Sequence, residues 1–262
     1  MLHDVSRTGN MDLDLKARQR AASLDRQYQG IGSEEFLRAI IEDEFPGRVA
    51  IVSSFGTESA LLLALAARIN PAIPVIFLDT GHHFPETLAY RDLVERRLGL
   101  TGLRTIKADG AELADRDAEA ALWQFDTDAC CSLRKVEPLQ RAISEFDALI
   151  SGRKNSHGAL RRFMPRVEAV DGLIKFDPIA DWSPEQVEEA FEALDLPRHP
   201  LIAHGYRSIG CRPCTAPAGD REDPRAGRWA GQAKTECGIH RAGRIVPARS
   251  EPDRVPALHA AS

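Results

Sequence analysis

The chain has 262 residues, of which 43% are hydrophobic and 28% charged, a composition that fits one large globular domain or one domain with long tails. Its net charge of −5 gives no overall sign of a nucleic-acid partner. No apolar run reaches the roughly 20 residues that a membrane-spanning helix needs, and residues 1–7 lack an apolar secretory core. We therefore expect a cytoplasmic protein, whose thiols serve metals or catalysis more often than disulfides.

The amino-terminal residues 1–32 are mostly polar and end near two glycines, so we expect a loosely ordered arm. Ser33 has the character of a helix cap, and Glu34 and Glu35 follow in the first turn, where the helix dipole favours acids. The sequence therefore predicts a helix that begins at Ser33 and ends before Pro46.

The segment 48–52 is β-branched and predicts a buried parallel strand. A loop of small residues, 53–59, follows it and leads into an apolar helix at 60–69. A strand, a small-residue loop and a helix start together place backbone amides around an anion. The loop lacks the lysine of the common phosphate-binding motif. An anion site and a plain strand–helix turn therefore both stay open on these residues.

A second strand at 75–78 ends at Asp79 and precedes a helix that Pro85 opens. Ligands of open α/β sheets bind at the carboxyl ends of the strands, where Ser53 and Asp79 fall. His82 and His83 follow, but no partner stands at metal-ligand spacing, so we favour a solvated loop over a metal site.

Strands and helices continue to alternate along the rest of the chain, which predicts an α/β fold with a mostly parallel sheet and helices on both faces. A capping-box pattern at Ser183 and Gln186 marks the last helix. The further strands expected are 103–107, 148–151 and 173–176, and the further helices expected are 111–125, 136–146 and 183–194.

Basic residues follow the strand at 148–151, among them Arg153, Arg161, Arg162 and Arg166. Cations after the carboxyl end of a strand can reach an anion bound over the sheet. A solvated basic loop is the alternative on these residues alone.

The five cysteines sort as four plus one. Cys130 and Cys131 are adjacent, and Cys211 and Cys214 form a C-x-x-C pair. Four thiolates suit either a tetrahedral zinc ion or a 4Fe–4S cluster. Directly adjacent ligands favour the cluster, since neighbouring residues can bind separate irons. Cys237 is left over as the candidate for chemistry.

Cys237 lies in a basic segment. Lys234 precedes it and His240 follows it, and nearby cations raise the reactive thiolate fraction of a cysteine. Arg225 and Arg228 are spaced so that they can clamp a sulfate or phosphate. A lone cysteine is often inert, but the basic segment and the upstream anion-binding loop favour a nucleophile.

These motifs together resemble the assimilatory adenylylsulfate reductases, the thioredoxin-dependent, iron–sulfur members of the adenine nucleotide α-hydrolase-like (PP-loop-like) group. The resemblance covers about residues 49–240. It is carried by residues 53–56 with Ser59, 78–81 with 84–87, Cys130 and Cys131 with Arg134, Lys135 and 138–139, then 151–153, 210–215, 225–229 and 234–240.

The resemblance implies two-electron reduction of adenosine 5′-phosphosulfate to sulfite and AMP, in sulfate assimilation and cysteine biosynthesis. The Cys237 thiolate would attack the sulfur and form an S-sulfonate, which thioredoxin or glutaredoxin would reduce. One 4Fe–4S cluster per chain would be held by the four other cysteines and would position Lys135 without carrying the electrons. This cysteine set also marks relatives that prefer the substrate without a 3′-phosphate. Further copies of the chain, as a homo-oligomer, are expected partners, whereas nucleic acid and membrane are not.

The resemblance also implies the roles of single residues. Lys135, Arg225, Arg228 and His240 would neutralise charge on the reacting oxygens. The expected substrate-binding residues are Ser53, Ser54, Phe55, Gly56, Ser59, Leu78, Asp79, Gly152, Arg153 and Arg162, and the expected metal ligands are Cys130, Cys131, Cys211 and Cys214.

Two segments depart from the pattern of the group. Residues 55–58 replace the double glycine and aspartate of its ATP-cleaving members, and 151–157 differ from the arginine-rich version of many relatives. The alternatives are the same reductase acting on 3′-phosphoadenylylsulfate, an ATP-using sulfur-transfer relative, and a zinc-bound nucleotide sensor.

Four segments are expected along the chain. Residues 1–32 form the amino-terminal arm and 33–214 the α/β domain that binds nucleotide and cluster. Residues 215–240 form a mobile catalytic arm that carries Cys237, and 241–262 a disordered tail.

Overall fold

The computed structural model describes residues 5–157, 161–219, 221, 223–232 and 234–241, and it is built around one six-stranded sheet. The strand order is β3-β2-β1-β4-β6-β5, and every pairing is parallel except that of β5 with β6. The strands are β1 (Val49–Val52), β2 (Val75–Asp79), β3 (Leu103–Lys107), β4 (Ala148–Ile150), β5 (Val167–Val170) and β6 (Leu173–Phe176). The predicted α/β fold with a mostly parallel sheet is confirmed.

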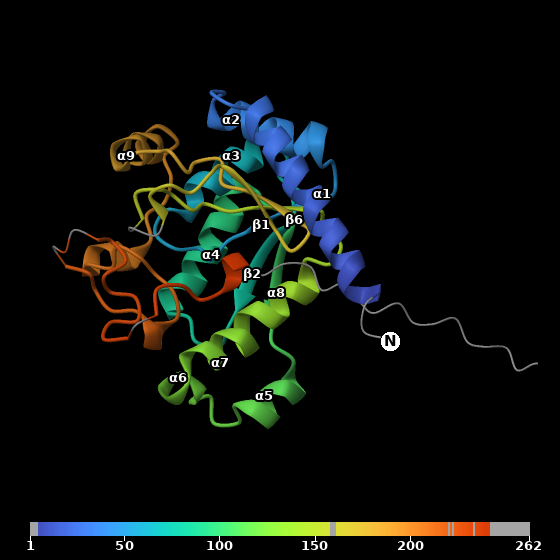
Figure 1. Ribbon diagram of the computed structural model, residues 1–262. Helices are drawn as coiled ribbons and strands as arrows, with labels where there is room; N and C mark the ends of the chain where they lie inside the picture. Colours follow the sequence, from blue (N-terminus) through green and yellow to red (C-terminus); the bar gives the residue numbers. More distant parts are fainter. Residues whose placement is uncertain (1–4, 158–160, 220, 222, 233, 242–262) are drawn as a thin grey trace, which may run out of the picture.

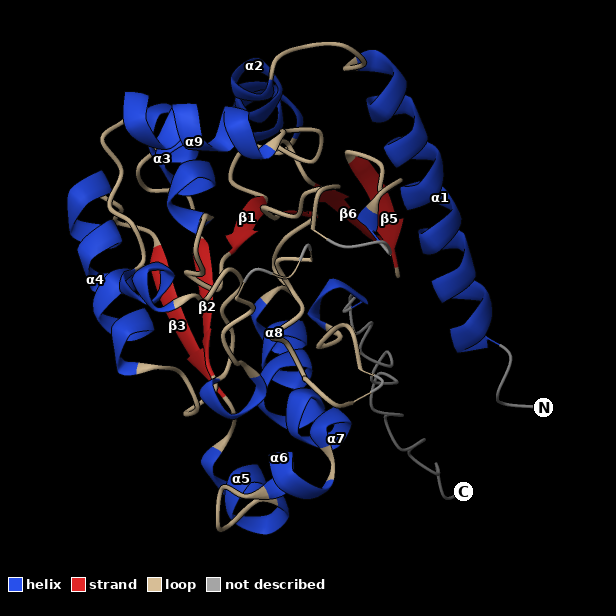
Figure 2. Cartoon of the chain, turned by 90° about the vertical axis from the view of Figure 1, so that its left-hand side faces the viewer, coloured by secondary structure: helices blue, strands red, loops and turns tan. Residues whose placement is uncertain are grey.

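Helices cover both faces of this sheet (Figures 1 and 2). The main helices are α1 (Val5–Gln27), α2 (Ser33–Arg38), α3 (Ser59–Ile69), α4 (Pro85–Leu98), α5 (Gly110–Arg116), α6 (Leu122–Phe125), α7 (Thr127–Cys131), α8 (Glu137–Ala142) and α9 (Pro184–Ala193). Short helical turns are η1 (Ala39–Glu44), η2 (Ser132–Val136), η4 (Pro200–His204), η5 (Arg212–Cys214) and η6 (Ile239–Arg241). None of the helices in the described part of the chain is both long enough and apolar enough to cross a membrane.

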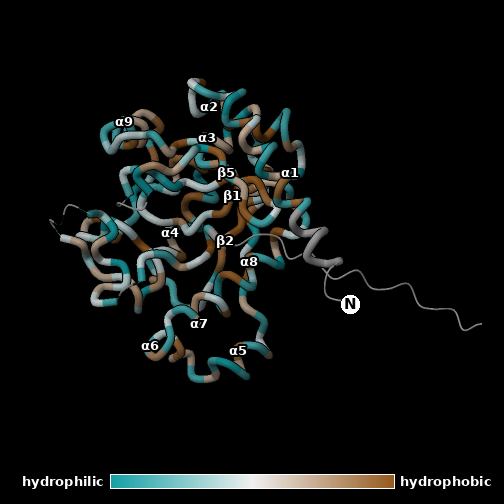
Figure 3. Tube along the Cα trace, viewed as in Figure 1, coloured by the Kyte–Doolittle hydropathy of each residue, from teal (hydrophilic) through white to brown (hydrophobic). Residues whose placement is uncertain are grey.

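Alternate residues of the central strands pack into two separate hydrophobic clusters. Val49 and Ile51 of β1 face a large core with α1, α2, α3, α4 and α9. Ala50 between them faces a smaller core, in which Leu139 and Ile143 cover the other side of the sheet. Hydrophobic colour accordingly gathers along β1 and β2, inside a more polar shell (Figure 3). Burial on both faces explains why these strands read as continuous apolar runs.

The amino-terminal segment differs from the loosely ordered arm that we expected, because residues 5–27 form helix α1. Ala17, Ala21 and Leu24 are buried at helical spacing against β5 and β6. Two of these three buried side chains are alanines, so the apolar stripe is narrow and hard to recognise in a polar sequence.

Ser33 also differs from its expected role, since its side chain does not cap α2. Its hydroxyl donates to the carbonyl of Pro178 at 2.7 Å and accepts the indole N–H of Trp182 at 2.7 Å. Ser33 therefore ties the start of α2 to the segment after β6. The capping box of Ser183 and Gln186 is confirmed at the start of α9.

The segment that follows Cys214 folds back over the carboxyl ends of the strands. Thr215 pairs with Arg228 in an antiparallel bridge, and the N–H of Trp229 donates to the carbonyl of Cys214 at 3.0 Å. Ile239 packs on the smaller core, and Lys175 donates to the carbonyl of His240 at 2.7 Å. The described residues of the expected arm are thus docked on the sheet, whereas residues 242–262 of the expected tail lie outside the described residues.

His199 is a buried imidazole whose protonation opposes folding. Its Nδ1 accepts the N–H of Leu201 at 3.2 Å, and its Nε2 lies 3.1 Å from the hydroxyl of Thr87. Burial lowers the pKa of His199 to about 4. Between about pH 6.5 and pH 4 the unfolded chain therefore binds a proton that the folded chain does not, and the free energy of unfolding falls as the pH falls through this range.

We expect His199→Asn to remove much of this pH dependence. Asparagine can still accept the N–H of Leu201, but it does not titrate. Chemical unfolding at about pH 7.5 and pH 4.5 should show that the variant loses roughly 2–3 kcal/mol less than the wild type over this interval. An unchanged pH dependence would mean that His199 is protonated equally in both states.

Candidate active site and cysteine cavity

One cavity lies where the loops after β1 and β4 meet the carboxyl-terminal segment. Its walls come from the predicted anion-binding loop, from residues 151–154 after β4 and from the segment around Cys237. Twelve of the predicted substrate-binding and catalytic residues line it: Ser53, Ser54, Gly56, Ser59, Leu78, Gly152, Arg153, Lys135, Arg225, Arg228, Cys237 and His240.

Three predicted site residues lie elsewhere. Phe55 has a positive φ of 48° and turns its ring into the core, where it meets Phe77 at a centroid distance of 5.6 Å. Asp79 pairs with Lys107 at 3.3 Å. Arg162 is exposed, and its neighbour Arg161 faces the cavity instead. The structure therefore does not bring Arg162 to the cavity wall, and its predicted contact with the nucleotide stays a prediction.

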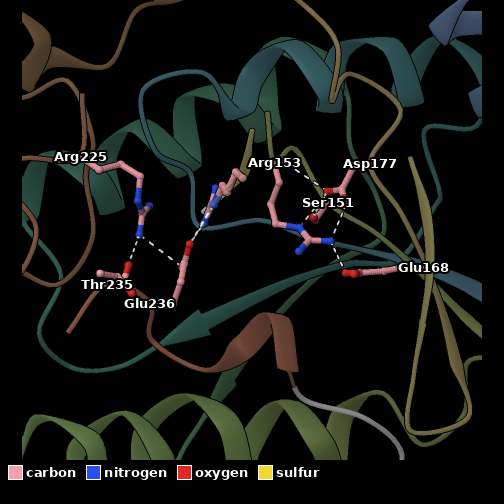
Figure 4. Close-up of polar contacts among 8 residues, drawn as sticks. Ser151, Arg153, Glu168, Asp177, Arg225, Thr235 and Glu236 are labelled. Carbon is pink, nitrogen blue, oxygen red and sulfur yellow. Dashed lines mark hydrogen bonds and ion pairs between the residues drawn. The ribbon is translucent and has the colours of Figure 1, made fainter. Parts of the chain in front are cut away.

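Arg153 lines the cavity, but its guanidinium is held by carboxylates. It contacts Asp177, which is fully buried, and Glu168, and Ser151 also donates to Asp177 (Figure 4). This network fixes the loop after β4 to β5 and β6.

Glu236, next to the candidate nucleophile, bridges two arginines. Arg161 donates to one of its carboxylate oxygens at 2.8 Å, and Arg225 reaches the other at 3.3 Å. Arg225 also donates to the carbonyl of Thr235 at 2.8 Å (Figure 4). The carboxylate of Glu236 therefore forms ion pairs with two cations that line the cavity, and it holds the Cys237 segment against the loop that follows β4.

Arg228 approaches the backbone of Gly210 very closely. A Cβ atom at Gly210 would lie 2.2 Å from its guanidinium, so a larger residue there would displace the Arg228 side chain. The guanidinium also stacks over the ring of Trp229 at 4.6 Å. These contacts hold a cation on the cavity wall beside Cys211.

His240 is surrounded by cations. Burial, together with the charges of Arg153, Arg161, Lys175 and Arg225, lowers its pKa well below the ordinary value. His240 is thus neutral at neutral pH unless an anion enters the cavity.

A second, smaller cavity adjoins the first and is lined by Cys130, Cys131, Cys211 and Cys214. Burial and the neighbouring thiols of Cys131 and Cys211 raise the pKa of Cys130 to about 12. Within the described residues, no group of three or more His, Cys, Asp or Glu side chains forms a site ready to hold a single metal ion. Two cysteine pairs from distant segments therefore face one space, where deprotonating all four would require a positive centre.

A buried ion pair supports this cavity. Arg134 donates twice to Asp117, at 2.9 and 2.6 Å, and once to the carbonyl of Thr80 at 2.9 Å. The hydroxyl of Thr80 lies 3.3 Å from the sulfur of Cys211. Arg134, three residues after Cys131, thus positions the Thr80 loop, which contacts Cys211 of the second cysteine pair.

Lys135 and Cys211 line both cavities. Burial alone would lower the pKa of Lys135, but the thiols of Cys211, Cys237 and Cys131 outweigh it and raise the pKa. One ammonium group therefore lies between the four-cysteine cavity and the lone thiol.

The sequence reasoning missed Glu58, Lys154 and His157, which line the first cavity together. Glu58 was noted only as a departure from the ATP-cleaving relatives. No single sequence motif marks these three residues, because they come from two loops that lie almost 100 residues apart in the chain.

The mostly parallel sheet, covered on both faces and with a cation-rich cavity at the strand ends, defines an α/β protein of the adenine nucleotide α-hydrolase-like class. The chain belongs to the phosphoadenosine phosphosulfate reductase domain family, whose model matches residues 48–217. The resemblance seen in the sequence is thereby confirmed.

The relatives carry two substrate names. The chain is 46% identical over 232 residues to adenosine 5′-phosphosulfate reductase of Mesorhizobium japonicum, covering 88% of this chain and 91% of that one. It is 39% identical over 227 residues to phosphoadenosine 5′-phosphosulfate reductase of Gloeobacter violaceus, covering 83% and 92%.

Solved structures agree with the fold. A phosphoadenylyl-sulfate reductase from Candida auris in complex with phosphate has a TM-score of 0.65 and 27% identity, covering 76% of this chain and 97% of that one. The FMN adenylyltransferase of Candida glabrata has a TM-score of 0.50 and 15% identity, covering 77% and 72%, and this likeness concerns the fold alone.

Proposed function

We propose that this protein reduces adenosine 5′-phosphosulfate to sulfite and AMP in sulfate assimilation, with Cys237 as the nucleophile. The observation that carries the proposal is the position of Cys237 in one cavity with Lys135, Arg225 and Arg228, at the end of a parallel sheet. The names of the relatives, adenosine 5′-phosphosulfate reductase over most of the chain, support the substrate.

The chemical step joins two anions, so the cations decide its rate. The Cys237 thiolate attacks the sulfur of the substrate, a new S–S bond forms, and the S–O bond to AMP breaks with its electron pair leaving on AMP. Lys135 and Arg228 stabilise the negative charge that gathers on the sulfonate and phosphate oxygens. His240, neutral in the free enzyme, gains a proton or donates a hydrogen bond when an anion arrives.

A dithiol then completes the reduction. One thiolate of thioredoxin or glutaredoxin attacks the Cys237 sulfur and releases sulfite, and the second thiol resolves the mixed disulfide, so that two thiols are oxidised for each sulfite formed. Because such a reductant is kept reduced in the cytoplasm, we place the reaction there. The carboxyl-terminal segment would have to open for a protein reductant to reach Cys237, which agrees with its proposed role as a mobile arm, and we propose a homo-oligomer as the working form.

We further propose that Cys130, Cys131, Cys211 and Cys214 hold a 4Fe–4S cluster. The donor set fits, because four thiols from two segments, three of them buried and that of Cys214 half-buried, face one cavity and each can bind a separate iron. When bound, the cluster would supply a fixed charge distribution beside Lys135, whereas the electrons would come from the dithiol. Because Lys135 lines both cavities, a cluster that fixes its ammonium group would also fix the positive charge beside Cys237.

The direct test is product analysis with protein purified anaerobically. We expect sulfite and AMP in equal amounts from adenosine 5′-phosphosulfate and thioredoxin, with about four irons per chain. Pyrophosphate release from ATP would instead indicate an ATP-using sulfur-transfer enzyme. Colourless protein with stoichiometric zinc and no sulfite would indicate a nucleotide sensor.

A further inference from the structure

Glu58, Lys154 and His157 form a compact charge cluster on the cavity wall. Glu58 precedes α3, and the two other residues follow β4. Lys154 forms an ion pair with the Oε2 atom of Glu58, and the Nε2 atom of His157 lies 3.1 Å from the same oxygen. Only 2% of Lys154 is exposed, so this cation is held in place by Glu58.

The cluster has no net charge at neutral pH. Burial alone would raise the pKa of Glu58, but the hydrogen bond from His157 and the charge of Lys154 outweigh it and lower the pKa to about 2. Burial lowers the pKa of His157, so the imidazole is neutral. The carboxylate therefore cancels the one cation of the cluster.

The cavity thus presents two chemically different regions. Lys135, Arg228 and Cys237 form the region suited to a sulfonate, whereas Glu58 offers a carboxylate. Lys154 and His157 both approach the Oε2 atom of Glu58, which leaves Oε1 as the oxygen that we expect to accept a hydrogen bond from a ligand. Because Glu58 and Cys237 line the same cavity, a nucleotide whose sulfonate lies against Cys237 can bring its ribose toward Glu58.

We infer that Glu58 is the residue that selects the nucleotide without a 3′-phosphate, by accepting a hydrogen bond from the ribose 3′-hydroxyl and repelling a phosphate at that position. A hydroxyl donates well to a carboxylate, whereas a phosphate dianion has no proton to donate and meets a like charge. Lys154 would favour such a phosphate if it were free, but Glu58 occupies it. The inference rests on the proposed function.

The test is Glu58→Gln, which keeps the shape of the side chain, removes its charge and frees Lys154. We compare kcat/KM for adenosine 5′-phosphosulfate and for its 3′-phosphorylated form in wild type and variant. The wild type should prefer the first substrate, and the variant should shift the ratio toward the second by at least about tenfold. A folded variant with a ratio within about twofold of the wild type overturns the inference.

Equilibrium binding keeps the inference separate from the proposed function. Calorimetry with AMP and adenosine 3′,5′-bisphosphate requires no chemistry, and Glu58→Gln should again favour the bisphosphate by at least about tenfold relative to the wild type. If the wild type produces no sulfite from either substrate, the proposed function fails. The binding ratio still supports or overturns the role of Glu58.

A second variant covers the event that an unpaired Lys154 prevents folding. Glu58→Gln combined with Lys154→Gln removes both charges, and it should weaken the discrimination without creating a phosphate site. The matched control is Glu188→Gln, which breaks an exposed pair with Arg198 outside the cavity and should leave the ratio unchanged. Unchanged discrimination in the double variant, or an equal shift in the control, overturns the inference.

Discussion

Replacing Cys237 by serine should lower sulfite formation from adenosine 5′-phosphosulfate by at least about 10³-fold. Cys237 lines the cavity with Lys135 and Arg228, and serine keeps the shape of the side chain but supplies an alcohol, which is scarcely ionised at neutral pH. Because the cations remain, the variant should still bind AMP with little change. Sulfite release in the presence of thioredoxin, followed beside AMP binding, measures both quantities.

Iron content and a neighbouring variant serve as controls for this result. Cys237 lies outside the lining of the four-cysteine cavity, so Cys237→Ser should retain the wild-type amount of iron. Gln232→Ala changes an exposed residue of the same segment and should stay within about twofold of wild-type turnover. Turnover by Cys237→Ser at the wild-type rate would show that another group is the nucleophile.

Replacing Lys135 by methionine should lower turnover by about 10²-fold while the iron content stays unchanged. The lysine side chain lies between the two cavities, next to Cys211, Cys131 and Cys237. Methionine preserves much of the packing of its stem and removes the charge that stabilises the sulfonate oxygens. Single-turnover measurements of S-sulfonate formation report this step directly.

Lys107→Met is the matched control for the lysine variant. Lys107 ends β3, its side chain is 68% exposed, and it pairs with Asp79 outside both cavities. Its removal should leave turnover within about twofold of the wild type. A wild-type rate of S-sulfonate formation in Lys135→Met would rule out the proposed coupling between the cysteine cavity and the reacting group.

The elements with strong local signals were predictable from the sequence. Continuous apolar runs marked β1 and β2, and Pro85 marked the start of α4. The division of the cysteines was also readable, since adjacent and C-x-x-C pairs are rare by chance and their four side chains do line one cavity. Local spacing sufficed because each of these signals lies within a few residues.

The parts that depend on distant packing were not predictable. Strand β5 is a short edge strand with one buried residue, Val167, and its antiparallel pairing needs β6 as a partner. Arg161, and not Arg162, faces the cavity. This depends on how the short turn that carries both residues is oriented, and the residue types alone do not reveal that orientation. The cluster at Glu58 exists only because β1 and β4 are neighbours in the sheet.

The nucleophile can be identified by mass spectrometry of the intact wild-type protein and of its peptides, after mixing with adenosine 5′-phosphosulfate in the absence of any reductant. We expect a mass increase equal to one SO₃ group on the peptide that contains Cys237, with one AMP released for each adduct, and we expect this increase to disappear when thioredoxin is added. An adduct on any of the four other cysteines, or AMP release without an adduct on Cys237, would contradict the assignment of Cys237 as the nucleophile.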